Sequence, residues 1–474
     1  MMDQRPVPPL PQAFLDRMRT DLKDEGSCDR FLHALSLPPL HALKINTLRG
    51  ISREDLPFTL SDQPVPWDSN SYYLAARKEE RPGKHALHEA GAYYLQEPSA
   101  MMPAMLLMGD LTDSRERTLS TGCLRVLDLC AAPGGKTVDL AMLLPPGSLL
   151  VTNEIHPARA RILSQNVERM GISDALVLNE TPERLAARFA AFYDRILVDA
   201  PCSGEGMFRK NPEAVAEWSP ENVVMCAERQ AGILDAAWEM LSPGGRLVYS
   251  TCTWAPAEDE EQIAAFLSRH PDASLAEEKK FFPHEVPGEG HYAALLTRDG
   301  TPAPGSSRST APDFRTAGKE KAERDRFLIW AEASLSDRFR RSLSPDRIFR
   351  FGEMLYQAPP MCPDLTGLHV LRPGLHLAEY HKDRQEPAHA LSHIMRTDDA
   401  AMAVDLTDHE IAVYLEGQSL RPDPLRMKIK NITPGETARG DVLITCHGIG
   451  TGWARYAGGM LKNRYPKGLR SSLI

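Results

Sequence analysis

Short apolar runs alternate with amphipathic segments through the middle of the chain. The apolar runs occupy residues 124–129, 149–154, 195–199, 245–251 and 291–296. Between them, residues 158–170 and 219–241 carry apolar side chains at helical spacing. Strands that alternate with helices in this way are typical of a parallel sheet with helices on both faces. The pattern therefore predicts a Rossmann-like α/β domain.

The regions on either side of this domain have weaker patterns. Residues 11–22 and 324–335 predict helices, and residues 42–48 and 368–371 predict strands. Residues 301–322 are rich in Gly, Pro, Ser, Thr and Lys, which predicts a linker. We therefore expect five segments, with bounds 1–90, 91–300, 301–322, 323–388 and 389–474.

The last segment contains a glycine-rich stretch, Gly-Ile-Gly-Thr-Gly-Trp, at residues 448–453. We expect this stretch to form a turn. The rings of Trp453 and Tyr456 offer faces on which an unpaired base stacks. Packing in the core is the alternative for either ring.

The composition is that of an ordinary globular protein. Of 474 residues, 42% are hydrophobic and 25% are charged, and this length predicts roughly two to four domains. The longest near-apolar run, residues 100–109, is too short to span a bilayer. Eight cysteines without paired C-x-x-C spacing favour free thiols over disulfides or a zinc site. We therefore expect a cytoplasmic protein with no metal and no membrane partner.

The charge is unevenly distributed. The net charge is −9, yet the segment 421–474 has ten Lys or Arg and three Asp or Glu, which gives +7. A basic surface of this kind binds nucleic acid phosphates, although it is also compatible with simple solvation.

A glycine turn supplies the first candidate site. Pro133-Gly134-Gly135 follows the strand at 124–129 and precedes a helix predicted over 137–144. A strand, a glycine turn and a helix together bring backbone N–H groups close to a nucleotide-like ligand. The spacing of a P-loop and the third glycine of a dinucleotide fingerprint are both absent. Glu154 ends the next strand, where a carboxylate accepts hydrogen bonds from ribose hydroxyls.

Two cysteines follow the next two parallel strands. Asp199-Ala200-Pro201-Cys202 ends one strand, and Thr251-Cys252 ends the other. The carboxyl ends of parallel strands form the ligand-binding edge of open α/β sheets. We therefore expect both thiols at the same edge as the glycine turn.

These motifs, in this order over residues 90–300, resemble the Sun/Nop family of RNA cytosine-C5 methyltransferases. The segment Gly91–Met101 resembles the one that precedes the catalytic domain in this family. The closing run Lys462–Arg470 resembles the end of the added C-terminal RNA-binding region of one subgroup. The resemblance implies a Rossmann-like S-adenosylmethionine-dependent core. It also implies a small α+β N-terminal RNA-recognition-like domain and a C-terminal PUA-like β-barrel module. The implied substrate is RNA, with 16S ribosomal RNA of the small subunit expected; the implied protein is a monomer that does not bind DNA.

The resemblance also implies residue roles. Carbon 5 of cytosine takes up a methyl group only after a thiolate has added to carbon 6, which requires a cysteine nucleophile. Cys252 is implied as this nucleophile and Cys202 as the group that assists its release. Asp199 is implied to contact either the ring or the amino group of the cofactor. The implied cofactor-binding residues are Cys130, Ala131, Ala132, Pro133, Gly134, Gly135, Lys136, Glu154 and Asp199.

Several of these residues also have a structural interpretation. Five cysteines have the pattern of small buried hydrophobes, and Cys130 is a sixth candidate; the five are Cys28, Cys123, Cys226, Cys362 and Cys446. Lys136 is also compatible with a plain helix start, and Arg209–Pro212 either contacts RNA phosphate or is only solvated. Relatives hold the adenine end of the cofactor with an aspartate after the third strand. Here Asn179 and Glu180 are the candidates.

Three rival functions remain to be weighed. DNA cytosine-C5 methyltransferases use the Pro-Cys cysteine as the nucleophile, and Thr251-Cys252 and the basic C-terminal segment argue against that class. A catalytically silent RNA-binding assembly factor is expected to have lost one of the two cysteines. Transfer RNA remains an alternative substrate.

Overall fold

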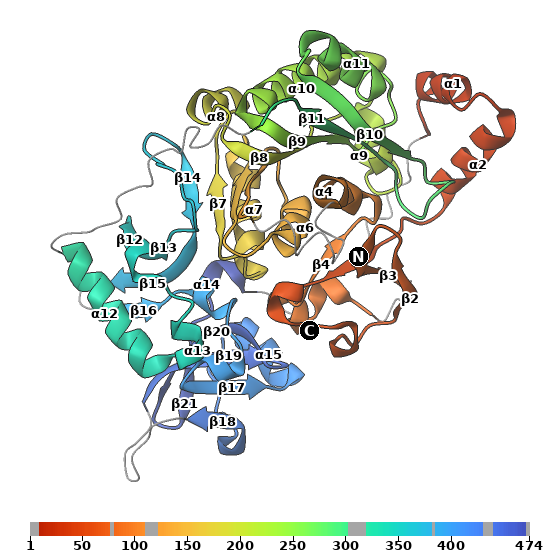
Figure 1. Cartoon of the computed structure of the whole chain (residues 1–474). Coiled ribbons are helices and arrows are strands. Elements are labelled where there is room, and N and C mark those ends of the chain that lie inside the picture. Colours follow the sequence, from red (N-terminus) through yellow and green to blue (C-terminus); the bar gives the residue numbers. More distant parts are fainter. Residues whose placement is uncertain are drawn as a thin grey trace.

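An eight-stranded sheet forms the centre of the computed structural model (Figure 1). The structure describes residues 9–75, 80–109, 122–301, 319–381, 384–429 and 439–470. The strand order is β10-β11-β9-β8-β5-β6-β7-β14. Its parallel part is β5 (Arg125–Asp128), β6 (Leu149–Asn153), β7 (Ala175–Leu178), β8 (Tyr193–Asp199) and β9 (Leu241–Thr251). The order reverses at β5, where open α/β sheets bind ligands. The predicted Rossmann-like domain is confirmed.

Alternate residues of each strand face opposite helical layers. Val126 packs with α4 (Met102–Met108), α6 (Gly135–Leu143) and α7 (Pro157–Arg169). Leu127 faces the other layer, which consists of α8 (Pro182–Arg188), α10 (Pro220–Met240) and α11 (Glu260–Arg269). The antiparallel strands β10 (Ala273–Phe281) and β11 (His291–Arg298) extend the sheet beyond β9. The near-apolar run at 100–109 is thus explained by α4, which is buried throughout.

The N-terminal unit has a four-stranded sheet of its own. Its strand order is β2-β3-β1-β4, with β1 (Ala42–Ile45), β2 (Leu60–Val65), β3 (Asp68–Leu74) and β4 (Tyr93–Gln96). The strand expected over 42–48 is therefore shorter, and a 3-10 turn follows it at Thr47–Arg49. Helices α1 (Gln12–Asp21) and α2 (Glu25–Ser36) pack on the catalytic domain, where Phe14 and Phe31 contact the aromatic rings of Phe208, Trp218 and Trp254.

The C-terminal region contains two further sheets and several helices. The first sheet, β12-β13-β15-β16, comprises β12 (Ile348–Phe351), β13 (Met354–Gln357), β15 (Leu375–His381) and β16 (Arg384–Pro387). The second, β18-β17-β19-β20-β21, comprises β18 (Met427–Ile429), β17 (Met402–Leu406), β19 (Gly440–Cys446), β20 (Ile449–Ala457) and β21 (Met460–Asn463). The helices are α12 (Lys319–Ser334), α13 (Asp337–Arg340), α14 (His389–Ser392) and α15 (Asp408–Leu415). The predicted linker at 301–322 lies largely outside the described residues, and α12 begins within it.

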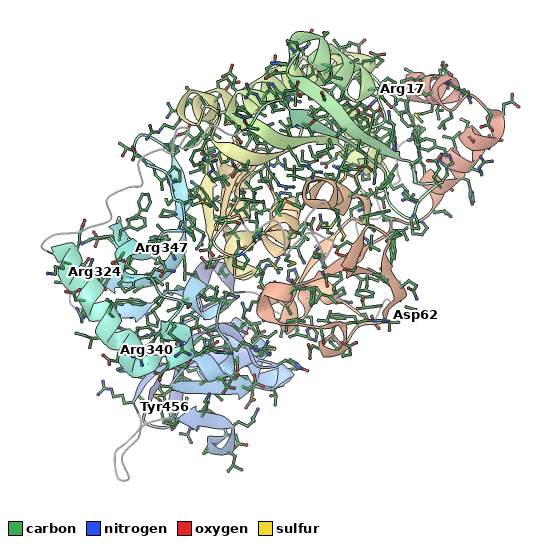
Figure 2. The ribbon with its side chains drawn as sticks, in the orientation of Figure 1. Arg17, Asp62, Arg324, Arg340, Arg347 and Tyr456 are labelled. Carbon is green, nitrogen blue, oxygen red and sulfur yellow. The ribbon has the colours of Figure 1, made fainter. Side chains whose placement is uncertain are left out.

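The expected turn at 448–453 is wrong. Of these six residues only Gly448, with φ +76°, lies in a turn, which it shares with His447, and β20 begins at the next residue. The other two glycines serve close packing, because a Cβ on Gly450 would stand 2.1 Å from Ser392 O and one on Gly452 2.3 Å from Tyr414 Oη. Trp453 is 3% exposed and its Nε1 donates to Ala388 O at 2.9 Å. Trp453 therefore packs in the core, and base stacking by this ring is excluded. Tyr456, by contrast, is half-buried; it is labelled in the last module in Figure 2 and packs against the cluster that contains Leu461.

The C-terminal region is built into the catalytic sheet. Strand β14 (Val370–Pro373), predicted two residues earlier, pairs antiparallel with β7 and forms the edge of the sheet. Arg372 of β14 makes an ion pair with Glu168 of α7, and both side chains are largely buried. The interaction is desolvated, so losing one partner leaves the other charge buried. The part of the chain beyond the linker thus cannot be removed without exposing an edge of the catalytic domain.

Among the described residues, no helix has the length and apolar character needed to cross a bilayer.

Arg372→Ala is expected to destabilise the protein by about 3–5 kcal/mol, because it leaves the Glu168 carboxylate buried without its partner. Urea unfolding followed by intrinsic fluorescence measures the change. Arg384→Ala is the matched control, since Arg384 is 63% exposed and its ion pair with the half-buried Glu386 contributes little in water. Equal shifts for the two variants would show that β14 is not anchored by this ion pair.

Candidate active site

The glycine turn joins β5 to α6. Gly134 has φ +117° and caps the helix, and a Cβ on this residue would stand 3.1 Å from Leu163 Cδ1. The first helical hydrogen bond runs from Val138 N to Gly134 O. The N–H groups of the preceding residues 135–137 therefore lie at the positive end of the helix dipole, where an anionic group is stabilised.

Glu154 stands beside this turn, at the end of β6. It is 3% exposed, and its Oε1 accepts a hydrogen bond from His156 N at 2.8 Å. Arg159 links the two features: one nitrogen lies 3.3 Å from Glu154 Oε2, and the other donates to Ala132 O at 2.7 Å. A helix N-terminus and a fixed carboxylate at the switch point of the sheet suit the amino-acid and ribose ends of S-adenosylmethionine.

The two candidates for the adenine end have different surroundings. Glu180 is engaged by Arg184 Nε at 2.6 Å and by His369 N at 2.7 Å. The amide nitrogen of Asn179 donates to Glu154 O and Ile155 O, at 2.7 and 2.8 Å. Both nitrogen protons of Asn179 are thereby used, and its Oδ1 is left to accept from an amino group. Between the two, this chemistry favours Asn179.

The two expected thiols meet at the neighbouring strand ends of β8 and β9. Cys202 Sγ lies 3.3 Å from Cys252 Sγ, and both cysteines are free. The hydrogen bond to Cys252, together with burial and the charge of Glu258, raises the pKa of the Cys202 thiol well above its usual value. Cys202 therefore keeps its proton, in a contact with Cys252 in which either sulfur is able to donate.

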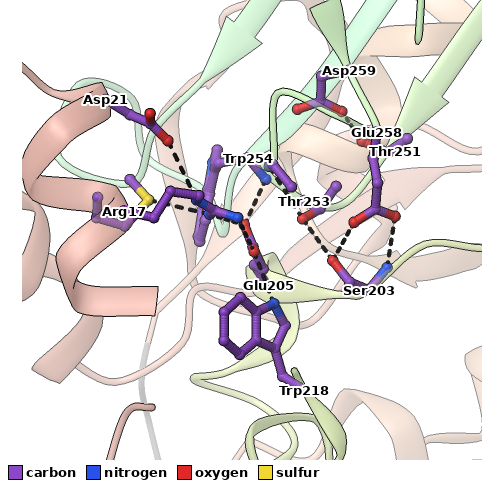
Figure 3. Close-up of polar contacts among 12 residues, drawn as sticks. Arg17, Asp21, Ser203, Glu205, Trp218, Thr251, Thr253, Trp254, Glu258 and Asp259 are labelled. Atoms are coloured by element: carbon purple, nitrogen blue, oxygen red, sulfur yellow. Dashed lines mark hydrogen bonds and ion pairs between the residues drawn. The ribbon is translucent and has the colours of Figure 1, made fainter. Parts of the chain in front are cut away.

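A buried carboxylate joins the two cysteine loops (Figure 3). Glu258 accepts hydrogen bonds from Ser203 Oγ and from Ser203 N, the latter at 2.9 Å. Ser203 Oγ also lies 3.0 Å from Thr253 Oγ1. Ser203 and Thr253 are the residues that follow the two cysteines, so this network fixes one thiol relative to the other.

A second buried carboxylate reaches the same loops from the N-terminal helices. Glu205 accepts from both terminal nitrogens of Arg17 at 2.7 Å, from Trp218 Nε1 at 2.9 Å and from Trp254 N at 3.0 Å (Figure 3). Next to it, Gly206 N donates to Cys252 O at 2.8 Å. Helix α1 is thereby tied to the loop that carries Cys252.

Asp199 stands at the end of β8 among polar partners. Its Oδ2 lies 2.8 Å from Lys136 Nζ, and its Oδ1 accepts from Ser250 Oγ at 3.0 Å. His291 Nε2 is 3.5 Å from the same Oδ1. Burial by itself raises the pKa of this carboxyl, but Lys136 and His291 outweigh burial and hold the pKa below its usual value. The same attraction raises the pKa of Lys136 against the effect of burial. Asp199 is therefore ionised and Lys136 charged.

Other expectations have mixed outcomes. Arg209 is an internal anchor that donates to Glu289 Oε2 at 2.5 Å, and its 4% exposed side chain excludes a phosphate contact. Lys210 lies 3.9 Å from Glu289 Oε1 and is 17% exposed.

Of the cysteines expected to be buried, Cys28, Cys226, Cys362 and Cys446 are, whereas Cys123 is exposed and Cys130 is intermediate. Cys123 is exposed because it precedes β5 instead of lying within it.

The basic C-terminal segment is more neutral than its sequence indicates. Four of its basic residues are ion-paired with carboxylates: Arg426, Lys428, Arg455 and Arg464. Two of the carboxylates, Asp398 and Glu410, precede the counted segment. Five others are exposed, namely Arg421, Arg439, Lys462, Lys467 and Arg470. Among the described residues of this segment, these five are the side chains that remain for a phosphate backbone.

Four family profiles match successive stretches that together cover most of the chain. The profile described as 16S rRNA methyltransferase RsmB/F matches residues 122–297, and that for the N-terminal domain of 16S rRNA methyltransferase RsmF matches 10–98. The RsmF first C-terminal domain and the methyltransferase RsmF PUA domain match residues 330–395 and 401–471.

Individual relatives agree with the profiles. "Ribosomal RNA small subunit methyltransferase F" of Salmonella agona is 31% identical and covers 97% of this chain and 96% of its own length. The protein of the same name from Aliivibrio fischeri is 28% identical, with 97% of each chain covered. Two structures from Pyrococcus horikoshii share the fold at TM-score 0.50, covering 61% of this chain. One is a methyltransferase homolog at 24% identity, covered over 100% of its length; the other is NSun6 with SFG at 18%, covered over 99%.

The fold and the site together define an S-adenosylmethionine-dependent RNA methyltransferase. The chain belongs to the ribosomal RNA small subunit methyltransferase F family, which lies within the Sun/Nop group indicated by its motifs.

Lys136→Met is expected to raise the pKa of Asp199, because burial is then opposed only by His291 and Ser250. In the wild type, the lowered pKa stabilises the fold above the carboxyl's unfolded pKa of about 4. In the variant, the buried carboxyl resists ionisation, so the loss of stability grows as pH rises. Thermal unfolding at pH 5 and pH 8 measures this difference, and a deficit that shrinks toward pH 8 would contradict it.

Proposed function

We propose that this enzyme methylates carbon 5 of cytosine in 16S ribosomal RNA through a covalent intermediate on Cys252. The observation that carries the proposal is the 3.3 Å contact between Cys202 and Cys252, at the strand ends next to Asp199. A second thiol this close to a nucleophile suits a reaction in which the enzyme–substrate bond must form and then break.

The first step uses Cys252 as the nucleophile. Its sulfur adds to carbon 6 of the ring, an S–C bond forms, and a proton is taken up at N3. Carbon 5 then has enamine character and is able to attack an electrophile. S-adenosylmethionine, when bound, supplies the electrophilic methyl group. The glycine turn, Lys136 and Glu154 are the residues we propose to hold it, with Asn179 at the adenine end.

The second step returns the thiol. A base removes the proton of carbon 5, the proton taken up at N3 is given back, the C5–C6 double bond re-forms, and the bond from carbon 6 to Cys252 Sγ breaks. Cys202 is protonated and lies 3.3 Å from that sulfur, so it is placed to donate to the departing thiolate and assist release. Asp199 is ionised and held by Lys136, which suits a hydrogen bond from a ring N–H or amino group.

The substrate assignment rests on the family relationship and on the C-terminal modules. The relatives that share the full length of the chain are named for small-subunit ribosomal RNA. The five exposed basic residues of the last module support phosphate contacts. An RNA of the ribosome implies action in the cytoplasm. The presence of both cysteines argues against a silent assembly factor.

Cys252→Ala is expected to abolish methylation and to leave no protein–RNA adduct, because nothing is left to attack carbon 6. Cys202→Ala is expected to permit attack but to stall release, so a covalent complex accumulates as a shifted band on a denaturing gel. Cys446→Ala is the control, since this thiol is buried in β19 of the last module, outside the catalytic domain. An adduct that survives loss of Cys252 but disappears with Cys202 would indicate the opposite division of roles.

Bisulfite sequencing tests the substrate. Ribosomal and transfer RNA from a deletion strain are compared with RNA from the same strain carrying the wild-type or the Cys252→Ala chain. We expect a protected cytosine in 16S ribosomal RNA that is lost on deletion and restored only by the wild type. Loss confined to transfer RNA would support the transfer RNA alternative instead.

A further inference from the structure

His291 is a buried ring with unused polar atoms at the active site. It begins β11 and is 2% exposed, and among the described residues neither ring nitrogen has a hydrogen-bond partner. Asp199 is a charged neighbour, and its Oδ1 lies 3.5 Å from Nε2. That distance is at the limit of a hydrogen bond. An unsatisfied buried polar group is costly and needs a reason in a native structure.

The backbone around His291 fixes the ring in this place. Gly290 has φ +103°, and a Cβ there would stand 2.4 Å from the ring of Trp254. On the other side, a Cβ on Gly206 would lie 3.1 Å from Gly290 O. In the sheet, Tyr292 pairs with Thr251, so His291 lies beside the strand end that precedes Cys252. The two glycines allow the histidine strand and the cysteine loop to pack in direct contact.

Charged groups face the ring from three elements. Asp199 comes from β8, Lys136 from α6, and Glu97 from the segment after β4. Burial and the charge of Lys136 lower the pKa of His291, and they outweigh the two carboxylates. The ring is therefore neutral at neutral pH, with one N–H donor and one lone pair.

The Asp199 carboxylate is still able to accept one more hydrogen bond from a neutral donor. Lys136 occupies Oδ2, and the hydroxyl of Ser250 occupies only part of Oδ1. A small closure of the site, from 3.5 Å to ordinary hydrogen-bond length, would give Oδ1 a second donor from His291. Asp199 would then be held on both oxygens while one face stays open to the substrate.

We propose that His291 is a positioning residue for Asp199, donating from Nε2 to Oδ1 and orienting the carboxylate toward the target cytosine. This inference rests on the proposed function, because it requires a carboxylate that contacts the base. The competing interpretation is that the imidazole only fills space between β11 and the Cys252 loop.

Two substitutions separate these interpretations. His291→Phe keeps a ring but removes the donor, and we expect kcat to fall about tenfold while KM for RNA and cofactor changes little. His291→Gln places an amide N–H near the position of Nε2, and we expect it to restore most of kcat. His376→Phe is the matched control, because His376 is also a buried, partly unsatisfied histidine but lies in the first C-terminal sheet. Its kcat should equal that of the wild type.

A double-mutant cycle tests whether His291 acts through Asp199. In an Asp199→Asn background, His291→Phe and His291→Gln are expected to be indistinguishable, because the carboxylate they serve is absent. Wild-type kcat in His291→Phe would overturn the proposal, and so would equal losses of kcat in His291→Phe and His291→Gln. The proposal would also be overturned if His291→Phe lowered kcat as much in the Asp199→Asn background as in the wild type. The proposed function fails separately, if Cys252→Ala retains methylation.

Discussion

The buried carboxylate of Glu258 is the constraint on which the geometry of the active site depends. The two cysteines belong to different loops. Ser203, which follows Cys202, donates to Glu258 and also contacts Thr253, which follows Cys252. Gln230 Nε2 donates to the same carboxylate at 2.9 Å. Burial raises the pKa of Glu258, although these hydrogen bonds oppose the rise. A carboxylate satisfied by several donors is directional, and two thiols at 3.3 Å tolerate little movement of either loop.

The same region shows why the enzyme needs its N-terminal helices. Glu205 is fully buried, and an unpaired carboxylate in that environment would be very costly. Arg17 of α1 neutralises it, while Trp218 and the backbone of Trp254 complete its hydrogen bonds. The helix that leads the chain therefore supplies a charge that the catalytic loop requires. Together with β14 at the opposite edge of the sheet, it makes the Rossmann-like domain dependent on segments from both ends of the sequence.

Local patterns predicted the elements that each stretch of chain forms by itself. The strand ending at Asp128, the helix after Gly134 and the strand ending at Asp199 follow from apolar periodicity and glycine turn chemistry within a few residues. The positions of both thiols at one sheet edge follow from parallel topology. What the sequence did not predict is contact between distant segments. Nothing in residues 370–373 indicates that they pair with β7, and nothing near Glu205 indicates that Arg17 neutralises it.

The errors have the same physical origin. Trp453 was assigned to base stacking or the core, and the core is correct because β20 passes between α14 and α15 at a separation that only glycine permits. The charge count over 421–474 omitted Asp398 and Glu410, which lie just before it in sequence but beside Lys428 and Arg426 in space. A linear count measures composition, whereas RNA meets the charges that remain after folding has paired the rest. Electrostatic recognition by the last module must therefore be sought at its exposed arginines and lysines, not in its net charge.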